Sequence, residues 1–498
     1  MKTNSLDFDA QALREKILDL AMRGKLVKQD PNDEPASVLL EKIKAEKAEL
    51  IKEKKIKKSK LLPEITDDEK PFDIPDSWEW VRLGEIGNYI QRGRSPKYDK
   101  ESLDHPIISQ KCVQWNSINI EDAKHITEDF FKKLEPYRFI QKNDILWNST
   151  GTGTVGRLNI VKDNYNHVPV DSHVTLMRMN QFIDSDYIYY FLRSPQIQKN
   201  LGDYLTGTTK QKELGLTNIL KINIPLPPLS EQSRIAAKIA ELFALLHKVE
   251  SSTQQYAKLQ TLLKSKVLDL AMRGKLVEQD PIDEPASVLL EKIKAEKEQL
   301  IKEKKIKRSK PLPPITDEEK PFEIPDSWEW VRLGEVLTIL RGGSPRPIKK
   351  YLTDSPNSIN WIKIGDSTVN SKYIDHAAEK IIPEGLDKTR EVHKGDFLLS
   401  NSMSFGRPYI LKIDGAVHDG WLILSDYDKL FDKNYLYYLL SSNFVNFQFK
   451  SLATGSTVKN LNRDRVAHTI ALVPPLLEQK RIIKKINYLL TKLNIKLY

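Results

Sequence analysis

Basic side chains recur in two short loops of the chain, each time beside glycine and proline. The sequence reads RGRSPK at 92–97 and RGGSPR at 341–346. Glycine and proline favour turns, and a turn can bring arginine or lysine to a phosphate or to the edge of a guanine. A solvent-exposed turn without any ligand would show the same pattern. The candidate DNA contacts in these loops are Arg92, Arg94, Lys97, Arg341 and Arg346.

Two further pairs of segments match each other across the chain. NDILWNSTGTGTVGR at 143–157 corresponds to GDFLLSNSMSFGR at 395–407, and TGTTKQKEL at 206–214 corresponds to TGSTVKNL at 454–461. Both members of the first pair end in arginine, and the second pair offers hydroxyl, amide and ammonium groups that suit phosphates and base edges. These segments add the candidates Arg157, Arg407, Thr208, Lys210, Gln211, Ser456, Lys459 and Asn460.

A search for catalytic motifs finds none with a matching context. GTGTVG at 151–156 fits the GxGxxG pattern of dinucleotide sites, but no βαβ unit surrounds it and the second copy, SMSFG, lacks the first two glycines. The sequence contains no phosphate-binding GxxxxGK(S/T) loop, no Asn-Pro-Pro-Tyr or Asp-Pro-Pro-Tyr element, and no HExxH or HxH group. We therefore expect no catalytic residue, no bound metal and no cofactor on this chain.

The chain repeats itself. Residues 18–58 return at 268–308, and residues 65–85 return at 315–335 with two differences, at positions 68 and 73. A third match joins IPLPPLSEQSRI, which starts at residue 224, to LVPPLLEQKRI, which starts at residue 472. The chain is thus two copies of one unit, and such self-similarity must be recognised before any fold is assigned.

Between the matching segments the two copies have diverged, which separates a shared scaffold from two variable modules. We expect compact α+β modules with many short strands, which begin at WEWVRL and EVLTIL and end with a helix, YIYYFLRSPQIQ or YLYYLLSSNFVN. Residues 76–226 are called the first module and residues 326–473 the second module. The flanking segments are 1–75 with the first half of a split helix, 227–325 with a central long helix, and 474–498 with the second half of the split helix.

The scaffold segments predict long helices with a coiled-coil seam. Apolar residues at alternating spacings of four and three follow the prolines at 227 and 228 and continue to the glycine at 274, as in a heptad pattern. The same spacing occurs after Pro475 and again near the N-terminus. We infer that the two terminal half-helices lie end to end, antiparallel to the central helix, with a pseudo-twofold axis relating the modules. The seam comprises Ile235, Ile239, Leu242, Leu246, Leu263, Ile482, Ile486, Leu489, Leu13 and Ile17.

Lysine-rich amphipathic segments follow each half of the scaffold, at 36–58 and 286–308. Such a face can attract phosphates. The other interpretation is a solvated helix that packs on the coiled coil through Val38, Ile43, Leu50 and Ile51, and we favour it because runs of charge are usually solvated. The tryptophans of the repeated WEW motif are interpreted as packing anchors.

Composition and charge restrict the class of protein. The 498 residues carry a formal charge of +10, but the first module has 19 Lys and Arg against 18 Asp and Glu, and the second has 19 against 17. The two modules therefore account for +3, and the other +7 lies in the flanking segments. Cys112 is the only cysteine, and apolar runs are too short to span a bilayer. We expect a cytoplasmic protein without membrane association.

Taken together, three motifs carry a resemblance to a known family. DSWEW followed by RLGE opens a module, TGSTVKNL lies near a module's end, and PLPPLSEQSRIAAKI opens a long helix. With the twofold repeat and its circular layout, they resemble the specificity subunit of type I restriction-modification systems over essentially the whole chain.

The resemblance implies a DNA-recognition role. Each module would read one half of a bipartite, asymmetric site in double-stranded DNA, and the shared helices would set the spacing and bind two methyltransferase subunits. Restriction subunits would join through the complex, and S-adenosylmethionine and ATP with Mg²⁺ would be bound by the partners. Two alternatives stay open from the residues alone: a stand-alone DNA-modifying enzyme with an unfamiliar site, and a coiled-coil adaptor that binds proteins.

Overall fold

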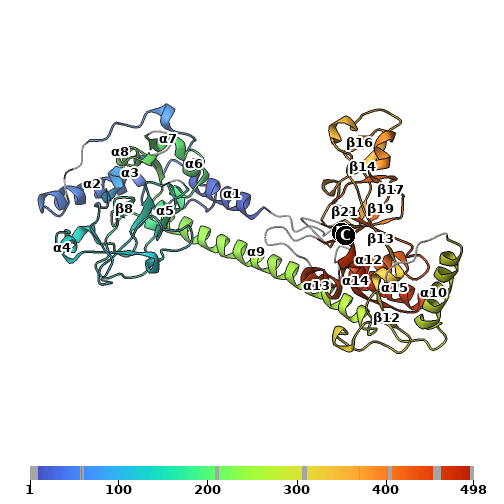
Figure 1. The fold of residues 1–498 in the computed structure, drawn as a ribbon. Helices are drawn as coiled ribbons and strands as arrows, with labels where there is room; N and C mark the ends of the chain where they lie inside the picture. Colours follow the sequence, from blue (N-terminus) through green and yellow to red (C-terminus); the bar gives the residue numbers. More distant parts are fainter. Residues whose placement is uncertain are drawn as a thin grey trace. The chain divides into compact units, whose positions relative to one another are not determined.

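The computed structural model describes most of the chain and divides it into two compact units. Unit 1 is Met1–Thr253 and unit 2 is Gln254–Tyr498, so the division falls within the continuous helix α9, Leu229–Met272 (Figure 1). The described residues are 9–56, 58, 61–101, 103–151, 153–207, 212–304, 311–369, 371–401, 406–452 and 461–493.

Unit 1 combines short helices and strands before α9. Its helices are α1 Ala10–Met22, α2 Ala36–Lys52, α3 Leu83–Ile86, α4 Glu128–Phe131, α5 Ser185–Leu192, α6 Pro195–Gln198, α7 Leu201–Tyr204 and α8 Leu216–Leu220. Its strands are β1 Glu79–Arg82, β2 Gly87–Arg92, β3 Tyr98–Asp99, β4 Pro106–Ile107, β5 Lys124–Ile126, β6 Ile145–Asn148, β7 Leu158–Ile160, β8 Val174–Met179, β9 Leu205–Thr206, β10 Glu213–Leu214 and β11 Asn223–Leu226.

An antiparallel sheet in the order β2-β8-β6-β7 forms the centre of the first module. Side chains alternate across it, because successive strand residues point to opposite faces. Trp147 packs with helix α5 and the start of α9 in one core, whereas Leu146 and Leu176 pack with Cys112 in another. Both faces of the sheet are therefore buried.

Unit 2 follows α9 with a similar set of elements. Its other helices are α10 Ala286–Lys302, α11 Leu333–Val336, α12 Lys433–Ser441, α13 Asn443–Leu452, α14 Arg463–His468 and α15 Leu476–Lys492. Its strands are β12 Glu329–Arg332, β13 Thr338–Arg341, β14 Ile359–Ile362, β15 Tyr373–Ile374, β16 Glu379–Ile381, β17 Arg390–Val392, β18 Phe397–Ser400, β19 Pro408–Leu411, β20 Gly415–Val417, β21 Trp421–Ser425 and β22 Ile470–Val473.

The sheet of the second module has the order β13-β21-β18-β19-β15, so its first four strands correspond to β2-β8-β6-β7. The second module adds a four-stranded sheet, β16-β14-β20-β17, where the first has the small sheet β3-β5-β4. In both modules the entering strand pairs with the leaving strand, β1 with β11 and β12 with β22. The α+β class expected from the sequence is confirmed, and the modules differ mainly in their insertions.

The repeated helix ends are set by glycine. Gly24 and Gly274 both have φ of +66°, the left-handed conformation that terminates a helix at little cost to glycine. A Cβ on Gly24 would lie 2.5 Å from Pro75. The chain therefore turns sharply here, directly against the segment that precedes β1.

The predicted seam is buried at some positions and exposed at others. Ile235, Ile239, Ile482 and Ile486 are fully buried, and they belong to the cores of their own units. Leu242, Leu246, Leu489 and Ile17 are half-buried. Leu13 and Leu263 are each 43% exposed. Continuous pairing along the whole seam stays a prediction.

Within unit 1, helix α1 runs antiparallel to the first part of α9. Arg14 near the start of α1 forms an ion pair with Glu250 late in this part of α9. Gln29, beyond the end of α1, donates to Glu231 in the first turn of α9. Opposite ends of the two segments thus meet.

The lysine-rich helix of unit 1 is shorter than expected, and one of its predicted packing residues is exposed. Helix α2 ends at Lys52, and Lys54 adopts φ of +60°. Leu39 and Ile43 are buried in the core of unit 1, whereas Val38, which we expected to be packed, is exposed. The predicted packing is therefore confirmed at Ile43 and wrong at Val38, whereas Leu50 and Ile51 are half-buried.

Candidate nucleic-acid interface

The matching loops of the first module meet at one edge of its sheet. The amide of Ser149, directly after β6, donates to the carbonyl of His173, directly before β8, at 2.8 Å. The amide of Leu214 in β10 donates to the carbonyl of Ser149 at 2.7 Å. Arg92 ends β2 beside this point, because β2 pairs with β8. Three segments that the sequence singled out thus form one cluster, here called the first loop cluster.

The second module repeats this backbone arrangement in a second loop cluster. The amide of Asn401, after β18, donates to the carbonyl of Gly420, before β21, at 3.0 Å. The amide of Leu461 donates to the carbonyl of Asn401 at 2.8 Å. The two clusters share their main-chain connections and differ in their side chains.

The glycine of each RG loop is required by close packing. A Cβ on Gly93 would lie 1.9 Å from the carbonyl oxygen of Val170, and a Cβ on Gly342 would lie 2.3 Å from that of His418. Both distances are far below van der Waals contact, and both neighbours are backbone atoms. The RG loop can therefore cross the loop before β8 or β21 only if it carries glycine at this position.

The basic residues of the first loop cluster fall into two groups. Arg92 donates to Glu213 Oε2 at 3.1 Å and to the Leu214 carbonyl at 2.6 Å, so it ties β2 to β10. Arg157 donates to Gln114 Oε1 at 2.9 Å and to the Gly153 carbonyl at 2.7 Å. Both guanidinium groups are thus engaged inside the module.

Arg94 and Lys97 are more accessible. Arg94 is exposed and pairs with Glu135 at 2.9 Å, an ion pair that solvent screens. Lys97 is also exposed. These two residues are the cations of the first RG loop that could reach a phosphate without breaking a buried contact.

In the second loop cluster two of the candidates, Arg341 and Arg346, lie beside one acidic residue. Arg341 donates through Nε to the Asp419 carbonyl at 3.2 Å. Arg346 is 83% exposed and lies 3.8 Å from the Asp419 carboxylate. Arg407 is half-buried. The candidates Thr208, Lys210, Gln211, Ser456, Lys459 and Asn460 lie outside the described residues.

Several polar residues of the clusters were missed by sequence reasoning. In the first cluster Thr150 is hydrogen-bonded to His173 at 2.7 Å, and Thr154 donates to Gln110 at 3.3 Å. In the second, Ser344 and Asp419 form a hydrogen bond. Thr150 and Thr154 belong to the matched 143–157 segment, and Ser344 follows the glycines of its RG loop. Their positions within matched segments could therefore have identified them from the sequence.

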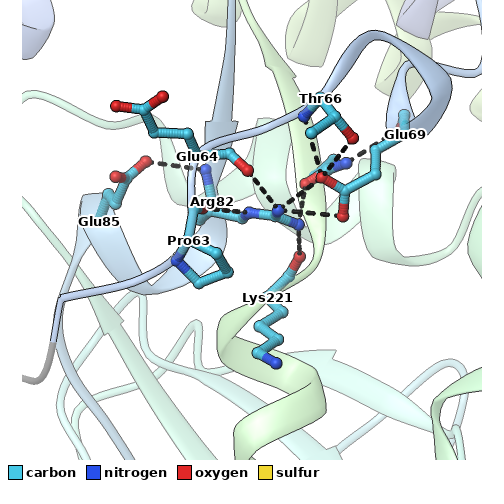
Figure 2. Close-up of polar contacts among 8 residues, drawn as sticks. Pro63, Glu64, Thr66, Glu69, Arg82, Glu85 and Lys221 are labelled. Carbon is cyan, nitrogen blue, oxygen red and sulfur yellow. Dashed lines mark hydrogen bonds and ion pairs between the residues drawn. The ribbon is translucent and has the colours of Figure 1, made fainter.

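A buried arginine fixes the start of each module to the preceding scaffold. Figure 2 shows the Arg82 guanidinium among the carbonyls of Pro63, Glu64 and Lys221 and the carboxylate of Glu69. Its side chain is 4% exposed. The same contacts recur in unit 2, where Arg332 donates to Pro313, Pro314, His468 and Glu319.

A second repeated network joins the module entrance to the long helices. Trp78 Nε1 donates to Glu231 Oε2 at 3.0 Å, and Trp328 Nε1 donates to Glu478 Oε2 at 2.9 Å. Burial raises the pKa of both carboxyl groups above the ordinary glutamate value. The first tryptophan of each WEW motif is thus a buried anchor that holds the module on α9 or α15.

The described part of the chain was also searched for other kinds of site. Within it, no group of three or more His, Cys, Asp or Glu side chains could hold a metal ion. No helix in this part is long and apolar enough to cross a membrane. The chemistry that the described part of the loop clusters offers is hydrogen bonding and ion pairing by exposed cations.

This arrangement defines a duplicated α+β protein with two similarly built, differently decorated polar loop clusters joined by helical segments. The sequence pattern of the type I restriction modification DNA specificity domain matches residues 75–259 and 325–497. The chain belongs to this family, and each copy contains one such DNA specificity domain.

Similar proteins carry the same description. The specificity subunit of the type I restriction enzyme EcoAI of Escherichia coli is 37% identical over 395 residues, which is 67% of this chain and 64% of that protein. That of EcoEI, also from Escherichia coli, is 34% identical over 457 residues, which is 79% of this chain and 73% of that protein. The chain thus spans just under two thirds of the first relative.

Solved structures support the fold. The HsdS subunit from Thermoanaerobacter tengcongensis is similar with a TM-score of 0.50 at 19% identity, covering 86% of this chain and 92% of that one. A chain from a structure of the assembly and conformational transition of a type I R-M system gives a TM-score of 0.55 at 20% identity, covering 85% and 93%.

Proposed function

We propose that this chain is the sequence-reading subunit of a type I restriction-modification complex. Residues 76–226 and 326–473 each read one half of a bipartite site in double-stranded DNA. The observation that carries this proposal is the repeated loop cluster, in which identical main-chain connections hold different side chains. Since base edges are distinguished by side-chain hydrogen bonds, two differently decorated clusters read two different half-sites, and the whole site is asymmetric.

The scaffold sets the spacing and binds partners in this proposal. Helix α9 continues between the modules, and the terminal half-helices complete an antiparallel, pseudo-twofold arrangement. Large apolar side chains on α9 are exposed, among them Leu245, Leu259 and Leu262. An exposed apolar stripe on a helix suits another helix, and we assign it to two methyltransferase subunits. Restriction subunits join through the complex.

We further propose that the chain itself is not catalytic and works in the cytoplasm. Adenine methylation with S-adenosylmethionine, and ATP- and Mg²⁺-dependent work, belong to the partner subunits. This division is consistent with loop clusters that contain cations and hydrogen-bonding groups, and its test is the activity of the purified chain alone with divalent metal or S-adenosylmethionine.

The central experiment is a genome-wide map of methylated adenine with the gene intact and deleted. The expected result is one two-part asymmetric motif that disappears on deletion. Replacing residues 336–453 with a second copy of residues 86–205 should then give a motif whose two halves are inverted copies of each other, because the pseudo-twofold scaffold presents its modules to opposite DNA strands. If deletion leaves the methylation map unchanged, although the parent cells express both the chain and its methyltransferase, the proposal is refuted and the protein-binding adaptor is favoured.

A further inference from the structure

Asp419 lies at the centre of the second loop cluster and is held there by the main chain. Its carbonyl oxygen accepts hydrogen bonds from Arg341 Nε at 3.2 Å and from Asn401 Nδ2 at 2.8 Å. Both donors belong to segments that recur in the two copies. The loop before β21 is therefore fixed in place, and the orientation of its side chains is fixed with it.

One oxygen of the Asp419 carboxylate is used inside the cluster. Oδ1 accepts from Ser344 Oγ at 2.9 Å. The His418 ring lies beside it, with Nε2 3.0 Å from Oδ1, and its Nδ1 accepts from the Gly420 amide. The hydrogen bond from Ser344 thus restricts the rotation of the carboxylate.

The other carboxylate oxygen of Asp419, Oδ2, has weaker contacts. Among the described residues, Oδ2 forms an ion pair with Arg346 at 3.8 Å, a distance that is longer than a hydrogen bond. Arg346 is 83% exposed, and the Asp419 side chain is 31% exposed. Oδ2 therefore offers a preorganised acceptor at the surface, beside a cation that is able to move to a phosphate.

A carboxylate in such a place has a specific use on DNA. It is repelled by phosphates, so it lowers affinity for DNA in general, and it gains energy only where a base edge presents a hydrogen-bond donor. In the major groove these donors are the exocyclic amino groups, N4 of cytosine and N6 of adenine, and carboxylates typically accept from cytosine N4.

We propose, resting on the proposed function, that Asp419 is a base-reading residue of the second module and selects a base with an exocyclic amino group. The first module lacks this carboxylate. Arg92 pairs with Thr175 and Arg341 pairs with Leu422, so three positions earlier Ser172 corresponds to Asp419. The two half-sites accordingly differ at the base that this position reads.

The test is the methylated motif written by the full chain together with its methyltransferase subunits in a host without adenine methylation of its own. Asp419→Asn keeps the size of the side chain and replaces one acceptor with a donor. The expected result is a change at one base position in one half of the motif, with about ten-fold or greater loss of discrimination there. The other half and the spacer should stay unchanged.

Asp354→Asn is the matched control, because Asp354 is an exposed carboxylate of the same module, and its motif should equal that of the wild type. An unchanged Asp419→Asn motif, or a uniform weakening at all positions, would overturn the inference. If that variant methylates nothing, duplexes selected by its purified complex from a randomised pool decide between the same two outcomes. A wild-type chain that writes no bipartite motif refutes the proposed function instead.

Discussion

Replacing Arg82 with methionine should loosen the entrance of the first module, and the chain contains its own control at Arg332. Arg82 donates to Glu69 and to three backbone carbonyls, and also to Asn223 Oδ1 at 2.7 Å. Arg332 repeats the carboxylate and the carbonyl contacts, but Ile470 faces it on β22 where Asn223 faces Arg82 on β11.

The magnitude follows from these contacts. Removing one partner of a buried ion pair costs about 3–5 kcal/mol, but Glu69 and Glu319 are 37% and 39% exposed and regain water. We therefore expect the lower end, about 3 kcal/mol, for Arg332→Met. Arg82→Met should cost about 1 kcal/mol more, because Asn223 also loses its donor.

Hydrogen exchange followed by mass spectrometry measures both sites in one chain. A local cost of about 3 kcal/mol corresponds to amide exchange faster by roughly 150-fold. The affected segments should be Glu79–Arg82 in one variant and Glu329–Arg332 in the other. Unchanged protection in both variants, or a larger effect of Arg332→Met, would refute the reasoning.

Three further predictions concern other parts of the molecule. In the methylation assay, Gly93→Ala should abolish recognition of one half-site, because its Cβ would lie 1.9 Å from a backbone oxygen. Gly202→Ala is the control and should be tolerated, because a Cβ there would have no atom within 4 Å. Burial lowers the pKa of Lys372 to about 8, so between pH 8 and 10.5 the unfolded state binds more protons than the folded state. The free energy of unfolding should therefore rise with pH in this range, by up to about 1.4 kcal/mol per pH unit. Lys372→Met should remove this slope in denaturation curves. Leu262→Glu on the exposed stripe of α9 should weaken co-purification of the methyltransferase at least ten-fold without lowering the melting temperature, whereas Ala257→Glu, about 140° around the helix, should not.

The duplicated organisation could be determined from the sequence, because it depends only on repeated segments and on local backbone preferences. Gly24 and Gly274 end their helices identically, since the same left-handed conformation is needed in both copies. The α+β class and the family followed from strand patterns and from motifs that recur at fixed distances. The matched segments also supplied the candidate loops, because their similarity has survived in modules that otherwise diverged, although only the structure showed that these loops meet at a sheet edge.

Only the tertiary structure decided what each candidate side chain contacts. Arg92 was a candidate DNA contact, but it ties β2 to β10 through a residue 121 positions away, a pairing that no local pattern encodes. Asp419 attracted no notice in the sequence, yet Ser344, 75 positions before it, orients its carboxylate. Helix α2 buries Leu39 instead of Val38 for the same reason. Residue type and spacing restrict the chemistry, whereas long-range packing chooses the partner and leaves particular groups facing solvent.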